Sequence, residues 1–232
     1  FRIVSRTTLA DARHQQGEWE AARRGFAEAE AMQAERKLEY LQLYSRPGFR
    51  YGELLLTEAE RAAWGGPAVA EGSEGCAQVA QRAAQALPIA MRNNHLLSIA
   101  LAQLTLARSA LYTDLLHGRT PGEDAQQHTE AAVAGLHRAG DQDELPLGLL
   151  TRAWLRHGLN NTDGAQADLA EAQRIAERGG MKLHLADIAL TRARLFEDKA
   201  ELAKARALIE ACGYGRRLPE LEDAEQRLRL TQ

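Results

Sequence analysis

One pattern of small and large apolar positions recurs along this chain of 232 residues. An alanine is followed four positions later by a large apolar residue, and three positions after that by a small one. The copies are Ala22/Phe26/Ala29, Ala83/Leu87/Ala90, Ala132/Leu136/Ala139, Ala165/Leu169/Ala172 and Ala205/Ile209/Cys212. Because these three positions share one face of an α-helix, each copy predicts a helix with a narrow buried stripe.

In three copies a second small residue lies twelve positions before the first alanine, at Ala10, Ala153 and Ala193. It falls on the preceding helix, where small residues allow close antiparallel packing. Glycines stand where these helices should stop and prolines where they should start. The helices are expected over residues 3–15, 18–36, 38–45, 49–63, 75–92, 95–117, 122–139, 145–158, 162–178, 182–197, 200–212 and 217–230.

This order predicts an all-α fold, a right-handed superhelical solenoid of about five stacked antiparallel hairpins in one domain, residues 1–232. The run WGGPAVAEGSEG at 64–75 is rich in small residues and predicts a flexible insertion. The segment 217–230 has Leu221, Ala224 and Leu228 at helical spacing, which predicts a capping helix on the last hairpin.

The run GEWEAARRGFAEAEAM at 17–32 has the order of Gly, aromatic, Ala and Phe of a tetratricopeptide second helix. Together with 43–56, 96–112 and 145–196, it resembles the divergent C-terminal tetratricopeptide regions of bacterial signal-transduction ATPases. The chain departs from the family in its uneven repeat spacing and in first helices without the consensus Trp and Tyr. The resemblance implies a sensor or autoinhibitory arm beside a nucleotide-driven switch domain.

Charge and hydropathy exclude several classes of partner. The 29 basic and 32 acidic residues are interspersed and sum to −3, so the basic field of a nucleic-acid-binding protein is missing. We expect no membrane span and no signal peptide, and therefore a cytoplasmic protein. The two cysteines, Cys76 and Cys212, are too few for a disulfide framework.

Motifs that carry chemistry are missing from the sequence. It has no GxxxxGK[ST] loop, and its seven histidines are scattered without HExxH or CxxC, so we expect no ATPase site, metal or cofactor. No serine or cysteine has a nucleophile motif around it, which predicts a protein that is not an enzyme. An arginine-rich stretch is expected on a solvated helix face rather than in a phosphate site, because glutamates are interleaved with it. It consists of Arg216, Arg217, Arg227 and Arg229, with Glu220, Glu222 and Glu225 between them.

A concave groove lined by the first helix of each hairpin is the expected binding surface. The position after each first-helix small residue should face this groove, and so should some positions one turn further on. These positions are Asp11, Glu53, Arg108, Tyr112, Trp154, His157 and Arg194.

Two hypotheses concern the middle of this groove. In the first, Arg108, Trp154, His157 and Arg194 bind an acidic peptide, because arginine matches a carboxylate in bidentate geometry. In the second, Trp154 packs between hairpins while the arginines pair with carboxylates of the chain itself, at Asp187, Glu197 or Asp198.

The sequence therefore predicts a non-catalytic module that binds a protein or peptide, including another domain of the same polypeptide. It would be the sensor or scaffold arm of a larger bacterial signalling protein. Two alternatives stay open, and an enzyme is a more distant one, which a converging His and carboxylate pair with perturbed titration would indicate. A small-molecule receptor needs a closed apolar pocket, and a homo-oligomeric array needs an exposed apolar patch on the first or last hairpin.

Overall fold

The computed structural model describes residues 2–36, 41–65 and 72–230, and every regular element in these ranges is helical. The elements are α1 (Arg2–Gln15), α2 (Trp19–Arg36), α3 (Ser45–Leu55), α4 (Thr57–Ala63), α5 (Gly72–Arg92), α6 (Leu96–Leu116), α7 (Glu123–Ala139), α8 (Leu145–Gly158), α9 (Thr162–Gly179), α10 (Lys182–Phe196), α11 (Lys199–Cys212), the 3₁₀ turn η1 (Gly215–Arg217) and α12 (Leu218–Leu230). The predicted all-α class is confirmed.

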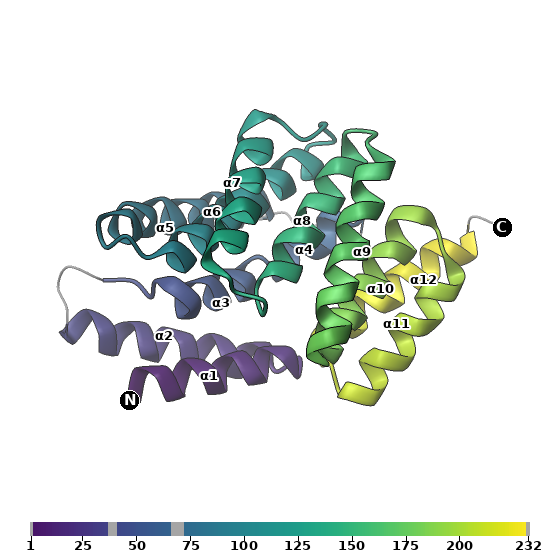
Figure 1. Ribbon diagram of the computed structural model, residues 1–232. Helices are drawn as coiled ribbons and strands as arrows, with labels where there is room; N and C mark the ends of the chain where they lie inside the picture. The colour runs from purple at the N-terminus through teal and green to yellow at the C-terminus, as the bar shows by residue number, and fades with distance from the viewer. Residues whose placement is uncertain (1, 37–40, 66–71, 231–232) are drawn as a thin grey trace.

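The helices pack mostly in sequential pairs, which Figure 1 shows from the purple α1 and α2 to the yellow α12. The most extensive contacts join α1 to α2, α5 to α6, α6 to α7, α8 to α9, and α10 to α11. A second series of contacts skips along the chain, from α1 to α3, α3 to α6, α6 to α8, α8 to α10, and α10 to α12. These skipping helices, together with the short α4 that follows α3, form an inner layer, and α2, α5, α7, α9 and α11 form an outer layer.

The repeated apolar pattern lies in the core. All five motif alanines are buried, and so are the three small residues predicted to oppose them, Ala10, Ala153 and Ala193. Phe26, Leu136, Leu169 and Ile209, the large motif residues of four copies, are also fully buried, whereas Leu87 in the second copy is only partly buried. The alanine stripes thus mark helix-to-helix contacts, as predicted.

Helix ends follow the local sequence. Gly140, Gly180 and Gly213 end α7, α9 and α11 with φ of 67°, 63° and 62°, a left-handed conformation that glycine adopts without a Cβ penalty. At the other ends, Asn161 Oδ1 and Asp198 Oδ1 accept backbone N–H groups from the first turns of α9 and α11.

Three predicted boundaries are corrected. The single helix expected over 49–63 is divided at Leu56 into α3 and α4. Residues 41–44 are not helical, and α3 begins at Ser45 and runs through Pro47, whose missing N–H is tolerated in a first turn. The rest of the helix expected over 38–45 lies outside the described residues at 38–40. The insertion expected over 64–75 is shortened because α5 begins at Gly72, and its centre, 66–71, also lies outside the described residues.

Helix α6 is long enough and apolar enough by composition to cross a membrane, and 61% of its most apolar window is buried in the molecule. Most of that window contacts the neighbouring helices, as in a central core helix.

The helix expected over 217–230 is present as α12. Leu221, Ala224 and Leu228 are buried in a cluster with α10 and α11, which places α12 on the last hairpin.

The end of the chain also contacts its beginning, which the sequence did not predict. Gly215 in η1 lies against the turn between α1 and α2, where an added Cβ would be 2.1 Å from the carbonyl oxygen of Gln16. Gly17 in that turn has φ of +83°, and a Cβ there would be 3.0 Å from the carbonyl carbon of Gly215. The two glycines therefore permit a contact that encloses the inner layer of helices.

Candidate functional site

Charged side chains gather where the inner helices meet η1, and we call them the central ion-pair cluster. It consists of five arginines and five carboxylates: Arg50, Arg108, Arg194, Arg216, Arg217, Glu53, Glu60, Glu144, Asp187 and Glu220. Because the two signs are equal in number, each charge has a counter-charge within the cluster. This balance makes burial of so many ions tolerable.

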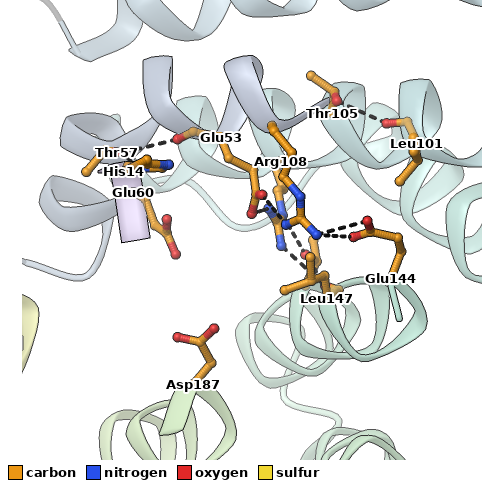
Figure 2. Close-up of polar contacts among 12 residues, drawn as sticks. His14, Glu53, Thr57, Glu60, Leu101, Thr105, Arg108, Glu144, Leu147 and Asp187 are labelled. Atoms are coloured by element: carbon orange, nitrogen blue, oxygen red, sulfur yellow. Dashed lines mark hydrogen bonds and ion pairs between the residues drawn. The ribbon is translucent and has the colours of Figure 1, made fainter. Parts of the chain in front are cut away.

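Arg217 joins the greatest number of elements. Its Nε donates to Asp187 Oδ1 at 2.7 Å, and its Nη1 donates to Glu60 Oε1 at 2.9 Å and to Glu220. Figure 2 shows Glu60 on α4 and Asp187 on α10 pointing into the same interior region from opposite sides. The neighbouring Arg216 donates to Glu60 Oε2 at 3.3 Å. The η1 turn thus connects α4 with α10 and α12 through the bonds of Arg217.

Glu53 on α3 is the corresponding centre among the acidic residues. Its Oε1 accepts from Arg108 Nη1 at 2.9 Å and its Oε2 from Arg50 Nη1 at 2.7 Å (Figure 2 shows the Glu53 and Arg108 side chains meeting). Burial alone would raise the pKa of Glu53, but Arg50, Arg216 and Arg108 outweigh it and hold the pKa well below the usual value. Glu53 is therefore an anion at neutral pH despite its burial.

Glu144, at the start of α8, accepts two bonds from Arg50 Nη2, both at 2.9 Å. Burial is the largest influence on this carboxyl and raises its pKa, although Arg50 and Arg46 oppose the change. Glu144 and Glu53 thus share Arg50 but differ in how strongly they hold a proton.

His14 on α1 borders the cluster and is fully buried. Thr57 Oγ1 donates its single hydrogen to the carbonyl oxygen of Glu53, so His14 Nε2 must be the donor in its 3.1 Å bond to Thr57 Oγ1. His14 Nδ1 then carries a buried lone pair with no hydrogen-bond partner among the described residues. Burial and the positive charge of Arg216 lower the pKa of His14 from 6.5 to about 2.

Aromatic rings extend the cluster toward α8. Trp64 stacks on Trp154 with ring centroids 3.7 Å apart and an interplanar angle of 13°, and Tyr112 lies 5.3 Å from Trp154 in a tilted arrangement. The guanidinium of Arg194 lies 4.8 Å over the Trp64 ring and donates to Glu220 Oε2 at 2.8 Å. Stacking on Trp64 and the ion pair with Glu220 thus hold the Arg194 side chain in one position.

The structure brings most of the predicted groove residues together. Glu53 contacts Arg108, Tyr112 lies against Trp154, and Arg194 is linked to Trp154 through the intervening Trp64. Both arginines pair with carboxylates of the chain, as in the second hypothesis, but with partners other than the three that the sequence suggested.

Two of the predicted groove residues lie at the margin. Asp11 Oδ2 is 3.8 Å from Arg50 Nε, at the edge of the cluster. His157 packs edge-on against Phe196 at 5.7 Å and makes no bond to the cluster in the described structure. Whether an external partner binds any of the seven residues stays a prediction.

Comparisons with protein families, with curated proteins and with solved structures found no match to this chain. The resemblance to tetratricopeptide arrays therefore stays a prediction from the sequence.

The expectation of a solvated helix face is confirmed for Arg227 and Arg229, which are exposed on α12, and is wrong for Arg216 and Arg217. They do not lie on a solvated face, because their exposed fractions are only 3% and 8% and both pair inside the cluster. The nearby Glu220 does pair with Arg217, but both are buried, and Glu60, the partner that Arg216 and Arg217 share, is 157 positions from Arg217 in the chain. No local signal in the sequence indicates a contact over that separation.

The described residues offer little for metal or nucleophilic chemistry. They contain no group of three His, Cys, Asp or Glu side chains placed to hold a metal ion. Ser98 Oγ lies 2.8 Å from Ser45 Oγ and 2.7 Å from His95 Nδ1, which also accepts the Ser98 backbone N–H and so caps α6. The adjoining pocket of about 30 Å³ has room for about one water molecule.

Proposed function

We propose that the chain is a non-catalytic protein-interaction module built as a right-handed tetratricopeptide-like solenoid of about five hairpins with a capping helix. The two series of helix contacts support this architecture. Each inner helix contacts the next inner helix, and each outer helix packs beside them. Stacked hairpins of this kind present their first helices to a common inner face.

The observation that carries the function is that this inner face already holds a polypeptide segment. Residues 214–217 of the chain lie against it, with Tyr214 Oη donating to Asp187 at 3.1 Å and Arg217 donating to Asp187 and Glu60. Carboxylates on α4 and α10 thus recognise side chains of a short basic segment. An inner face with this chemistry suits a peptide better than a small metabolite.

We further propose that the module is the sensor or scaffold arm of a larger bacterial signalling protein. The sequence resemblance supports this role, and so does the inner face, because a segment bound in cis is the arrangement that an autoinhibitory arm requires. A small-molecule receptor is less well supported, because it needs an enclosed pocket of roughly 300–1,000 Å³. The pocket beside Ser98 measures about 30 Å³, and the far larger hollow along α1 and α2, about 880 Å³, is an open surface groove.

Affinity capture with the full chain tests the proposal. Proteins retained from lysate of the source cell are purified and titrated against the unmodified chain and an Arg217→Met variant, at a temperature where circular dichroism shows both folded. A partner of the inner face should bind the variant more tightly, because the segment that occupies this face is loosened. Equal affinity places the partner on an outer surface.

Two results would contradict the proposal. One is no saturable protein partner together with a thermal shift caused by a small molecule, which indicates a receptor. The other is a particle mass that rises with concentration and no other partner, which indicates a homo-oligomeric array.

A further inference from the structure

A wide groove lies on the outer face of the first hairpin, between α1 and α2. It measures about 880 Å³ and is lined in part by Leu9, Ala10, Ala21, Gly25 and Met32. The helices approach closely there, since a Cβ on Gly25 would lie 3.0 Å from Ala10 Cβ. The groove therefore has a shallow apolar floor between the ridges formed by α1 and α2.

This face differs from the same face of the later hairpins. The preceding outer helix covers the first helix of each later hairpin, as α2 contacts α3, α5 contacts α6, α7 contacts α8, and α9 contacts α10. No helix of the described chain takes that place beside α1. Leu9, the large apolar side chain of α1 that lines the groove, is accordingly open to solvent, with an exposed fraction of 52%.

The charge around the groove indicates what would cover it. Four arginines line it against two glutamates, so its lining carries +2 although the whole chain carries −3. Arg6 pairs with Glu28, whereas Arg2 and Arg24 have no acidic partner among the described residues. Two copies joined face to face through this groove would bring these unpaired arginines together, which disfavours a second copy as the occupant.

We propose that this groove binds an amphipathic helix of a partner protein, with apolar residues along one face and Asp or Glu on both flanks. The apolar face packs on Leu9, Ala21 and Gly25, and the flanking carboxylates pair with Arg2 and Arg24. Helix-in-groove recognition uses apolar anchors at a spacing of three to four residues, which matches a floor between two parallel ridges. This inference rests on the proposed interaction role and names its surface and the chemistry of its partner.

A titration of the ¹⁵N-labelled full chain tests it. The probe is a capped helical peptide of about 18 residues, five turns, with Leu and Ala on one face and Glu on the flanks. Its counterpart has Lys in place of every Glu. The acidic peptide should shift amide resonances of Leu9, Ala21 and Gly25, and the basic peptide should leave them unchanged.

Charge-reversed variants test whether Arg2 and Arg24 contribute to binding of the acidic peptide. Arg2→Glu with Arg24→Glu should weaken binding of the acidic peptide by at least about tenfold. The matched control, Arg92→Glu with Arg138→Glu, makes the same charge change at exposed positions of α5 and α7 and should keep the affinity within about twofold.

Several outcomes would overturn the groove assignment. They are resonance shifts confined to another surface, equal binding of the two peptides, no binding at about 1 mM, or a dimer that the Arg2 and Arg24 variant abolishes. The interaction role itself would be contradicted only by the absence of any saturable protein partner. A protein captured by the chain and unaffected by the Arg2 and Arg24 substitutions leaves that role intact and removes only this surface.

Discussion

Mild acid should weaken the fold because of one buried side chain, His14. In the unfolded chain this histidine titrates at its ordinary pKa of 6.5, whereas in the folded protein its pKa is lowered to about 2. A proton on Nδ1 would lie beside the charge of Arg216 and find no acceptor among the described residues. Folding therefore requires the neutral ring throughout the mildly acidic range.

The magnitude follows from proton linkage. Below pH 6.5 the unfolded state binds one more proton at His14 than the folded state, so the stabilisation is fully present above 6.5 and is lost as pH falls. Between about pH 7 and pH 5 the loss is roughly 2 kcal/mol in the free energy of unfolding. Any folded pKa below about 4 gives nearly the same figure over this range.

The assay is urea denaturation at several pH values in this interval, with the unmodified chain and a His14→Gln variant. Glutamine keeps a side-chain N–H for Thr57 but does not titrate, so the variant should lose about 2 kcal/mol less on acidification. Burial also lowers the pKa of His184, which leaves some pH dependence in both proteins. His117→Gln, at an exposed helix end, is the control for loss of a histidine. Equal pH slopes for the unmodified chain and His14→Gln would refute the argument.

The remaining predictions concern the contacts that η1 makes with α10 and with the turn between α1 and α2. Arg217→Met should lower the free energy of unfolding by about 3–5 kcal/mol, because it leaves buried carboxylates without their counter-charge. Arg229→Met, at a side chain that is 81% exposed, should change it by less than about 0.5 kcal/mol in the same urea titration. A double-mutant cycle of Arg217→Met with Asp187→Asn should give a coupling of at least about 1 kcal/mol, and additive effects would show that the 2.7 Å contact contributes little. Gly215→Ala should cost about 1–3 kcal/mol through its clash with a backbone carbonyl in the first interhelical turn. The control for that clash is Gly75→Ala, where a Cβ meets nothing within 4 Å, and a similar loss there would contradict the explanation.

The sequence by itself determined the helices and the faces that they bury. Alanine stripes such as the one that includes Ala165 and Ala172 lie in the core, and Gly140 and Gly213 end helices where glycine was expected to. These signals are local, because helical periodicity and end-capping depend on residues within a few positions of one another. The inner-layer positions could be predicted for the same reason, and the pairing of Glu53 with Arg108 brings two of them into contact.

Only the tertiary structure decided which charges meet. Arg216 and Arg217 follow a helix end and have glutamates close by, so their local sequence is that of a solvated turn, yet they are buried against carboxylates more than 150 positions away. The contact depends on how the helix pairs are placed relative to one another, which brings η1 to α1, and on two glycines that allow the backbones to touch. That placement is the sum of the packing angles between all neighbouring helices. No single stretch of sequence encodes that sum, so the closed inner face and its balanced charges emerge only from the assembled fold.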